Sequence, residues 1–506
     1  MNNKKRIIVN SFYLYGRTLI LMFVTLYTSR MALISLGVSD FGLYSIINSV
    51  IILFSFVQNV FSLSTQRFLT IEISKNDDAK INKTFKCIVL MYLIVCAFVF
   101  ILSETFGVWF ILSQVKSSTV SSYDIFIVYQ ISIATLLLQI MQTPFMGYLL
   151  ASEQMAMFAK IGIFDAFQRW LMVFLFVSFY FQSKIIAYSI FLFFGYVSVF
   201  ILYFYYCSKG ISIYNIAFIK DRDSSLLKEI FSFTRWPLLG AFSVVSMSQA
   251  MAYLAYYFVG LVANASMWLA EQIISAFNRV TGALQMAFTP QIIKNCSNGK
   301  VVEAHGLILL SCKVTAYAII LSGIPIFIYV DLFIKLWLNE APPYLSNFIR
   351  IAIVFVFIDS LSNPFVTAIY ANGDLKRYQI IISLIMTFSV LFMISSLFIG
   401  FSIYVAFIIR VLCSLVLLVL RVFWVNSIYP LFCFNFSLFK DFIKLMLVAI
   451  FSLLISSCVK FYFLGLYNSL IVVSVFNFII TSVFFFFFII NSNERQSVLQ
   501  IFRKYI

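Results

Sequence analysis

The chain is a succession of hydrophobic runs, each long enough to cross a lipid bilayer. About 20 apolar residues span the hydrocarbon core, and runs of that order recur along the whole sequence. They lie at roughly 11–34, 41–68, 87–113, 123–150, 158–181, 185–207, 232–262, 264–290, 306–333, 346–370, 379–399, 402–425, 442–463 and 468–490. This pattern predicts an all-α polytopic membrane protein with about 14 transmembrane helices.

The composition excludes most soluble functions. Charged residues make up 11% of the chain, whereas a soluble domain has about 25%. The net charge of +16 falls in short breaks between the runs, so we expect no nucleic-acid binding. The 8 cysteines form no CxxC pair, the single histidine cannot make a metal site, and no catalytic triad or phosphate loop is visible. We therefore expect no enzymatic activity, no cofactor and no metal.

The distribution of Lys and Arg predicts the orientation in the membrane. If the N-terminus lies in the cytoplasm, almost all of the basic loop residues fall on the cytoplasmic side. The outer segments then hold only Lys116, Lys184, Lys335 and Lys460. Cytoplasmic loops are enriched in positive charge, so both termini are predicted to be cytoplasmic.

Repeated landmarks predict an internal duplication. Pro144-Phe145 and Pro364-Phe365 each stand near the end of a run, with an alanine seven residues after the proline. Three more pairs follow in the same order, namely Gly37 and Gly260, Thr65 and Thr289, and Trp109 and Trp337. We expect a six-helix lobe over 1–215, a second over 216–430, and two additional helices with a cytoplasmic tail over 431–506. Two such lobes would be related by an axis along the membrane normal, with a cavity between them.

Polar residues recur at helical spacing on four of the runs. The aligned residues are Asn10, Arg17 and Thr28 on the first run; Tyr44, Asn48, Ser55, Asn59, Ser62 and Gln66 on the second; Arg235, Ser246, Gln249, Tyr253 and Tyr257 on the seventh; and Glu271, Ser275, Asn278, Gly282 and Gln285 on the eighth, with Arg279 on its flank. Polar groups are costly against lipid. These faces therefore predict cavity lining, and the alternative is hydrogen bonding between helices without a cavity.

The stripes supply the candidate site residues. Those proposed to contact substrate are Arg17, Asn48, Gln66, Gln249, Tyr253, Glu271, Asn278, Arg279 and Gln285. Arg279 lies near the middle of its helix and favours ligand contact, whereas Arg17 could also extend toward the cytoplasmic surface.

Three carboxylates are candidates for binding a coupling ion. They are Glu271, Asp359 and Asp40. Asp40 could instead cap a helix, and Asp359 could instead pair with Arg410. A further carboxylate, Asp165, is expected to pair with Arg169 four residues later on the same helix.

Two segments resemble a known family. The stretch from Phe233 to Ile292, which begins FTRWPLLGAFSVV, resembles helices 7 and 8 of polysaccharide transport proteins. Leu33 to Val50, LISLGVSDFGLYSIINSV, resembles the turn between helices 1 and 2 of that family. These proteins belong to the multidrug/oligosaccharidyl-lipid/polysaccharide (MOP) exporter superfamily, whose fold is MATE-like. The chain lacks the dense arginine cluster of the lipid II flippase branch beyond Arg17 and Arg30.

The resemblance implies a Wzx-type flippase of the bacterial plasma membrane. Such a protein moves an undecaprenyl-pyrophosphate-linked oligosaccharide, for example an O-antigen unit, by alternating access between two lobes around a cationic cavity. The implied partners are the lipid-linked oligosaccharide, membrane lipid, protons or sodium ions for coupling, and polysaccharide assembly proteins. One alternative is a multidrug or cation-coupled antiporter of the same superfamily, using Glu271 or Asp359. Another is a membrane polysaccharide polymerase or ligase, which the short and histidine-free outer loops disfavour.

Overall fold

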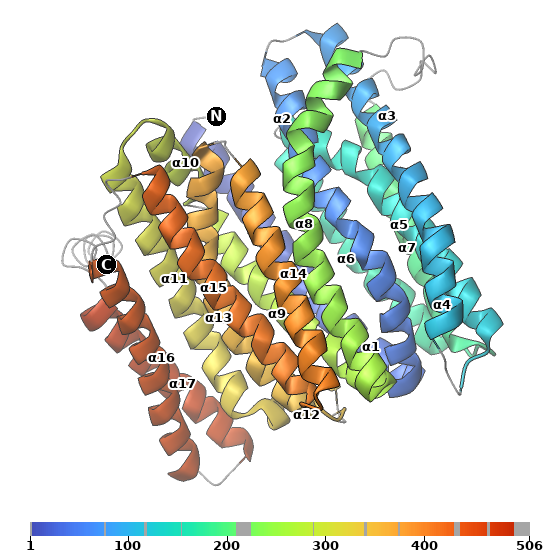
Figure 1. Ribbon diagram of the computed structural model, residues 1–506. Coiled ribbons are helices and arrows are strands. Elements are labelled where there is room, and N and C mark those ends of the chain that lie inside the picture. Colours follow the sequence, from blue (N-terminus) through green and yellow to red (C-terminus); the bar gives the residue numbers. More distant parts are fainter. Residues whose placement is uncertain are drawn as a thin grey trace. The chain divides into compact units, whose positions relative to one another are not determined.

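The described part of the protein is almost entirely helical. The computed structural model describes residues 3–74, 77–115, 119–152, 154–208, 224–286, 288–338, 342–372, 375–429, 436–462 and 466–489. These residues form long helices and no β-strand (Figure 1). Within them, 12 helices are long and apolar enough to cross a membrane. The predicted all-α polytopic membrane fold is confirmed.

The contacts divide the chain into two compact units. The first unit contains Met1–Gln272 and Lys376–Ile403. Its elements are α1 (Asn3–Ile52), η1 (Leu53–Ser55), α2 (Phe56–Ser74), α3 (Asp78–Leu102), η2 (Ser103–Gly107), α4 (Val108–Gln114), α5 (Ser122–Ala151), α6 (Met155–Ser178), α7 (Lys184–Ser208), α8 (Ser224–Val259), the start of α9 (Leu261–Met286), and α14 (Lys376–Phe398).

The second unit contains Ile273–Leu375 and Tyr404–Ile506. Its elements are the rest of α9, α10 (Thr289–Ser297), α11 (Val301–Ile328), α12 (Val330–Leu338), α13 (Leu345–Asn372), α15 (Ile403–Ile428), α16 (Phe436–Tyr462), α17 (Leu466–Phe484) and η3 (Phe485–Ile489). The predicted lobes over 1–215 and 216–430, and the duplication that relates them, stay predictions.

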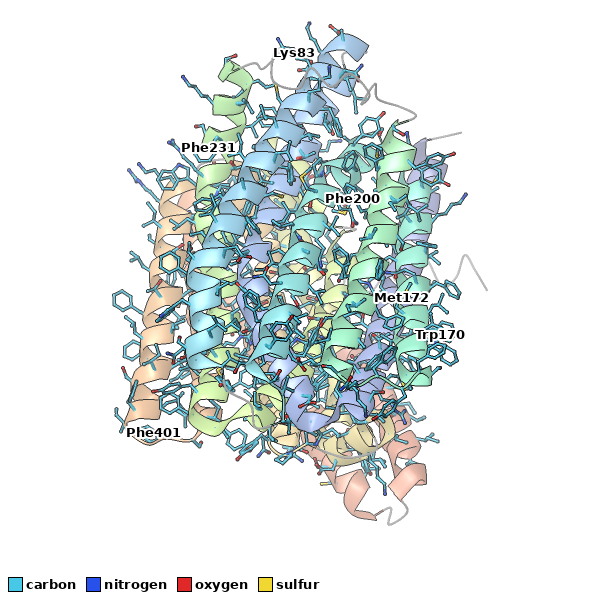
Figure 2. The ribbon with its side chains drawn as sticks, turned by 90° about the vertical axis from the view of Figure 1, so that its right-hand side faces the viewer. Lys83, Trp170, Met172, Phe200, Phe231 and Phe401 are labelled. Carbon is cyan, nitrogen blue, oxygen red and sulfur yellow. The ribbon has the colours of Figure 1, made fainter. Side chains whose placement is uncertain are left out.

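Two glycines end helices where the sequence predicts breaks. Gly37 bends α1, with φ of 80° and ψ of 165°, and Gly260 separates α8 from α9 with φ of 113°. Both values lie in the left-handed region, which side chains other than glycine rarely adopt. The predicted boundaries after the first and seventh runs are therefore confirmed. Within the first unit, Figure 2 places Lys83 and Phe231 near one end of the helices and Phe401 near the opposite end.

Prolines inside two helices of the second unit leave backbone carbonyls without their usual donor within the helix. Side-chain amides of other helices donate to these carbonyls. A proline has no N–H, so it frees the carbonyl four residues earlier. Pro364 in α13 frees the carbonyl of Ser360, which accepts a hydrogen bond from Gln285 Nε2 at 3.0 Å. Because water is absent from the bilayer core, such a partner is needed there. Gln285, predicted to line a cavity, thus supports the backbone of α13.

The two C-terminal helices attach to α11 through polar contacts. Asn477 of α17 donates to the carbonyl of Leu321 at 3.0 Å, the carbonyl freed by Pro325. Tyr317 and Ser482 share a hydrogen bond of 2.8 Å. Lys313, whose side chain is 1% exposed, pairs with Asp441 of α16 at 3.7 Å. These contacts bind α16 and α17 to the rest of the second unit.

Candidate functional site

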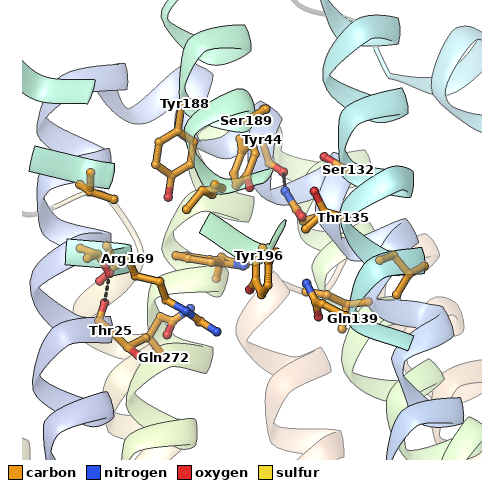
Figure 3. Close-up of a pocket in the computed structure, with 18 residues that line it drawn as sticks. Thr25, Tyr44, Ser132, Thr135, Gln139, Arg169, Tyr188, Ser189, Tyr196 and Gln272 are labelled. Carbon is orange, nitrogen blue, oxygen red and sulfur yellow. Dashed lines mark hydrogen bonds between the residues drawn. The ribbon is translucent and has the colours of Figure 1, made fainter. Parts of the chain in front are cut away.

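A polar cavity lies inside the first unit, among five helices. Its volume is about 260 Å³. It is lined by Thr25, Thr28, Ser29, Tyr44, Asn48, Ile52, Ser132, Thr135, Leu136, Gln139, Arg169, Val173, Tyr188, Ser189, Leu192, Tyr196, Trp268 and Gln272. Figure 3 shows Arg169 and Gln272 on one side of this cavity and Thr135 and Gln139 on the other.

Helical spacing explains why each helix brings several side chains to the cavity. On α5 the lining positions are 132, 135, 136 and 139, and on α7 they are 188, 189, 192 and 196. Residues three, four and seven apart share one face of a helix. On α1 the lining residues come from both sides of the bend at Gly37, so both arms of this bent helix border the cavity.

The serine and threonine hydroxyls of the cavity donate to backbone carbonyls of their own helices. Ser132 Oγ donates to the carbonyl of Val128 at 2.7 Å, and Thr135 Oγ1 donates to that of Ile131 at 2.8 Å. Such hydroxyls keep lone pairs that can accept from a ligand. The side-chain amides of Gln139 and Gln272 make no hydrogen bond within the described residues, so they can both donate and accept.

Arg169 is the charged residue of the lining, and its charge is balanced inside the protein. Its Nε and Nη2 donate to the two carboxylate oxygens of Asp165, both at 2.8 Å, in a bidentate ion pair. The predicted pairing of Asp165 with Arg169 is confirmed. The guanidinium also lies 5.0 Å from the ring centre of Tyr196. The described lining therefore presents hydroxyls, amides and aromatic rings with no unbalanced charge.

A second, mostly apolar cavity borders the next residues of α1. Its volume is about 420 Å³. It is lined by Ser49, Leu53, Phe54, Phe106, Gly107, Trp109, Phe110, Ser246, Gln249, Ala250 and Tyr253. Ring contacts shape one wall, since Phe110 and Tyr253 lie 5.2 Å apart. Position 48 of α1 faces the polar cavity and position 49 faces the apolar one.

The residues predicted to contact substrate lie at several different places in the structure. Asn48 lines the polar cavity, while Gln249 and Tyr253 line the apolar one. Arg17 lines neither cavity: its guanidinium lies 4.3 Å from the ring centre of Phe158. It fits there because Gly162 has no side chain to occupy that space.

The remaining candidates lie elsewhere in the two units. In the first, Gln66 is half-buried on α2 and Glu271 is half-buried on α9. In the second, Asn278 is exposed and Arg279 is half-buried on α9, while Gln285 contacts Ser360 as described above.

The surroundings of two predicted coupling carboxylates, Asp359 and Asp40, are defined by contacts with other segments. Asp359 on α13 interacts electrostatically with Arg421 and Arg410 of α15. Arg410 also lies 4.3 Å from the ring centre of Phe355. Asp40 accepts a hydrogen bond of 2.7 Å from the hydroxyl of Thr119.

Sequence reasoning missed most of the polar cavity. The faces of α5 and α7 were not recognised, although Ser132, Thr135 and Gln139 recur at spacings of three and four residues. Tyr188, Ser189 and Tyr196 on α7 show a similar pattern. Serine and threonine are common in membrane helices and bond their own backbone, so such a pattern is weaker than a stripe of amides and charges.

The fold is similar to solved structures of transporters, whereas the sequence matches no family model and no curated protein. An inward-facing multidrug resistance MATE family transporter of the MOP superfamily aligns with a TM-score of 0.68 at 12% identity, covering 83% of this chain and 98% of that chain. A MOP superfamily transporter from Pyrococcus furiosus, described by the reverse polarity of its binding pocket, gives 0.62 at 12%, with coverages of 84% and 96%. The Vibrio cholerae MATE transporter VcmN gives 0.61 at 12%, with coverages of 84% and 96%. The chain thus has the fold of MATE transporters of the MOP superfamily.

Proposed function

We propose that this protein is a flippase that moves a lipid-linked oligosaccharide across the bacterial plasma membrane. The observation that carries the proposal is the chemistry of the polar cavity, which offers hydroxyls, amides and aromatic rings without unbalanced charge. A sugar presents many hydroxyl groups together with apolar ring faces, so it suits such a lining. A few placed polar groups among aromatic side chains are typical of small-molecule sites.

The same cavity disfavours a cationic drug as the ligand. A buried carboxylate that attracts a cation must not already be neutralised. Asp165, which pairs with the lining residue Arg169, is held by the Nε and Nη2 groups of that arginine. The multidrug or cation-coupled antiporter remains the second candidate because solved transporters of that kind share the fold.

The rest of the proposal concerns the lipid pyrophosphate and the transport cycle. Arg279 and Arg17 are the proposed contacts for the pyrophosphate, since a guanidinium binds phosphate oxygens well. We place both termini in the cytoplasm and expect alternating access between the lobes over 1–215 and 216–430. Coupling to protons or sodium ions, and association with polysaccharide assembly proteins, belong to the same hypothesis.

A pair of glutamine variants on α5 tests the proposal. Gln139→Leu removes an amide of the cavity, whereas Gln142→Leu changes a matched residue outside the lining. A lost hydrogen bond of about 0.5–1.5 kcal/mol corresponds to roughly a 2- to 10-fold loss of affinity. We expect Gln139→Leu to lower surface glycan in a deletion strain by a factor in that range, and Gln142→Leu to leave it unchanged. Protein level is measured in each strain so that misfolding is not mistaken for lost transport.

Two outcomes would contradict the flippase. One is undiminished glycan display in the deletion strain when no redundant transporter is present. The other is a deletion strain that accumulates a fluorescent cationic dye, with efflux restored by the wild-type protein and impaired by Gln139→Leu. The second outcome would favour the antiporter.

A further inference from the structure

A π-helical turn interrupts one of the membrane-spanning helices of the first unit and carries an acidic residue. The span Ala79–Gln114 contains α3, the π-turn η2 (Ser103–Gly107) and α4. Glu104 lies on this turn, well inside the span. Single π-turns within α-helices often occur at functional sites, and an ionisable residue inside a membrane is itself a candidate for function.

The neighbouring helix α5 is shaped to fit the π-turn. Tyr129 Oη donates to the carbonyl of Ser103 at 2.8 Å. The Tyr129 hydroxyl occupies the space in which a side chain at position 107 would begin, so Gly107 permits the contact. One residue along α5, Gln130 Nε2 donates to Glu104 Oε2 at 3.1 Å. The turn and its acidic side chain are therefore held at a defined place against α5.

Two oxygens at this place have no partner. Glu104 Oε1 and Ser103 Oγ are both buried and make no hydrogen bond within the described residues. Ser103 as a whole is 0% exposed. An isolated carboxylate is strongly disfavoured in an apolar environment unless its charge is compensated. Within the part of the chain that the structure describes, no Lys, Arg or His forms an ion pair with Glu104.

The other titratable groups around the π-turn are neutral in their ordinary state or lie farther along the helices. Tyr129 of α5 interacts electrostatically with Glu104. Nearer to the turn lie Cys96 on α3, and Tyr253 and Tyr256 on α8, whereas α4 has no titratable group. The positive charges of the adjoining elements are Lys80, Lys83 and Lys86 on α3, and Lys228 and Arg235 on α8. Lys86 precedes Glu104 by 18 residues, about 27 Å of helix, and Arg235 precedes Tyr253 by as many.

We propose that the π-turn forms a binding site for a small monovalent cation, a proton or a sodium ion, centred on Glu104. A proton would bind Glu104 Oε1 directly. A sodium ion would be held by oxygens, which are the ligands that hard cations prefer, and Glu104 Oε1 and Ser103 Oγ are available for this role. Phe106 and Gly107 of the same turn border the apolar cavity, whereas Glu104 and Ser103 line neither cavity. The proposed site does not depend on what the protein transports.

The test uses the full-length purified protein in detergent and measures binding without a transport substrate. Equilibrium binding of radioactive sodium detects the sodium form, and infrared difference spectroscopy of the carboxylic acid band detects the proton form. The variants are Glu104→Gln, which removes the charge, and Ser103→Ala, which removes one oxygen. Gln130→Leu keeps the carboxylate and removes its donor. Glu303→Gln, an exposed carboxylate at the start of α11, is the matched control.

If the ligand is sodium, the wild type binds about one ion per chain, Glu104→Gln lowers the affinity at least 10-fold, and Ser103→Ala also weakens binding. If the ligand is a proton, sodium does not bind, and a carboxylic acid band that titrates with pH disappears in Glu104→Gln and persists in Ser103→Ala. In both cases Gln130→Leu changes the measured quantity, which is the sodium affinity or the pH at which the carboxylic acid band titrates. Glu303→Gln leaves that quantity unchanged. If Glu104→Gln does not fold, Glu104→Asp and Gln130→Leu provide the comparison. The proposal is overturned if folded Glu104 variants match the wild type in both measurements.

Discussion

Arg169 and Asp165 show how the charge of an arginine inside a membrane-spanning bundle is neutralised by an ion pair. The two lie four residues apart on α6, so the helix itself brings them together, and the bidentate geometry follows from the planar guanidinium. This pair could be predicted from sequence because its partners share one helix. The position of Arg169 beside Tyr196 of α7 could not, because it depends on how two helices pack.

Breaking this pair should destabilise the first unit. Asp165→Asn leaves the Arg169 guanidinium, whose side chain is 32% exposed, with one neutral partner. We expect a loss of roughly 1–3 kcal/mol, below the value for a fully buried pair because water reaches part of the arginine. Thermal unfolding of the purified protein measures the loss. The double variant Asp165→Asn with Arg169→Gln should recover part of it, and a double variant less stable than Asp165→Asn would refute the ion-pair explanation.

Gln285 illustrates what residue spacing cannot tell. The sequence places it on a predicted polar stripe together with Asn278. Its partner is a backbone carbonyl of another helix, which is free only because Pro364 follows four residues later. Both features are visible in the sequence, but their encounter depends on the packing of α9 against α13.

Replacing Gln285 should therefore affect stability. Gln285→Leu leaves the carbonyl of Ser360 without its donor, at a cost of about 1–3 kcal/mol for an unsatisfied buried group. Gln291→Leu, an exposed residue on α10, serves as the control and should change the melting temperature little. Equal melting temperatures for wild type and Gln285→Leu would show that the hydrogen bond is unimportant.

At the scale of elements, the interface of α11 with α16 and α17 is the clearest feature that the sequence did not reveal. We call this interface, which includes Lys313 and Asp441, the seam. The two last runs were recognised as helices outside the predicted repeat, but no partner for them could be assigned. Lys313 stands inside an apolar run, and its partner Asp441 is 128 residues later, at the start of α16. Only the folded structure joins positions so far apart.

Asp441→Asn should loosen this seam. It replaces the carboxylate that pairs with Lys313, whose side chain is 1% exposed, by a neutral amide. Removing one partner of a buried pair costs on the order of 3 kcal/mol. Lys444→Gln removes the more exposed lysine that also pairs with Asp441 at 3.8 Å, and it should cost much less. Thermal unfolding and protease resistance measure both variants, and equal losses in the two would contradict the primary role given to Lys313.

At the scale of the whole molecule, hydrophobic run length predicts the architecture well because the bilayer imposes one length on every spanning helix. The sequence predicts about 14 spans, and 12 helices within the described residues satisfy length and hydropathy together. The two runs that do not stand as separate spans, 41–68 and 264–290, are among those with the polar stripes. Their polar residues lower the mean hydropathy, and the first is also divided by η1. Two of the four runs with polar stripes are thus the runs that length and hydropathy do not count as separate spans.

The orientation of these helices in the membrane is the last prediction. Lys83 and Phe231 lie near one end of the first unit and Phe401 lies near the other, which matches the alternation predicted from the basic residues (Figure 2). A single cysteine placed at Lys184 or Phe401 in a variant without native cysteines should react with an impermeant maleimide applied to intact cells. Cysteines at Lys83, Lys228 or Arg377, all exposed, should react only after the plasma membrane is opened. These positions test the rule that positive charge is retained in the cytoplasm. Labelling of the cysteine at position 228 in intact cells, or protection of the cysteine at position 401, would contradict the prediction. Either result would mean that the orientation is inverted or that the number of spans between the two positions differs.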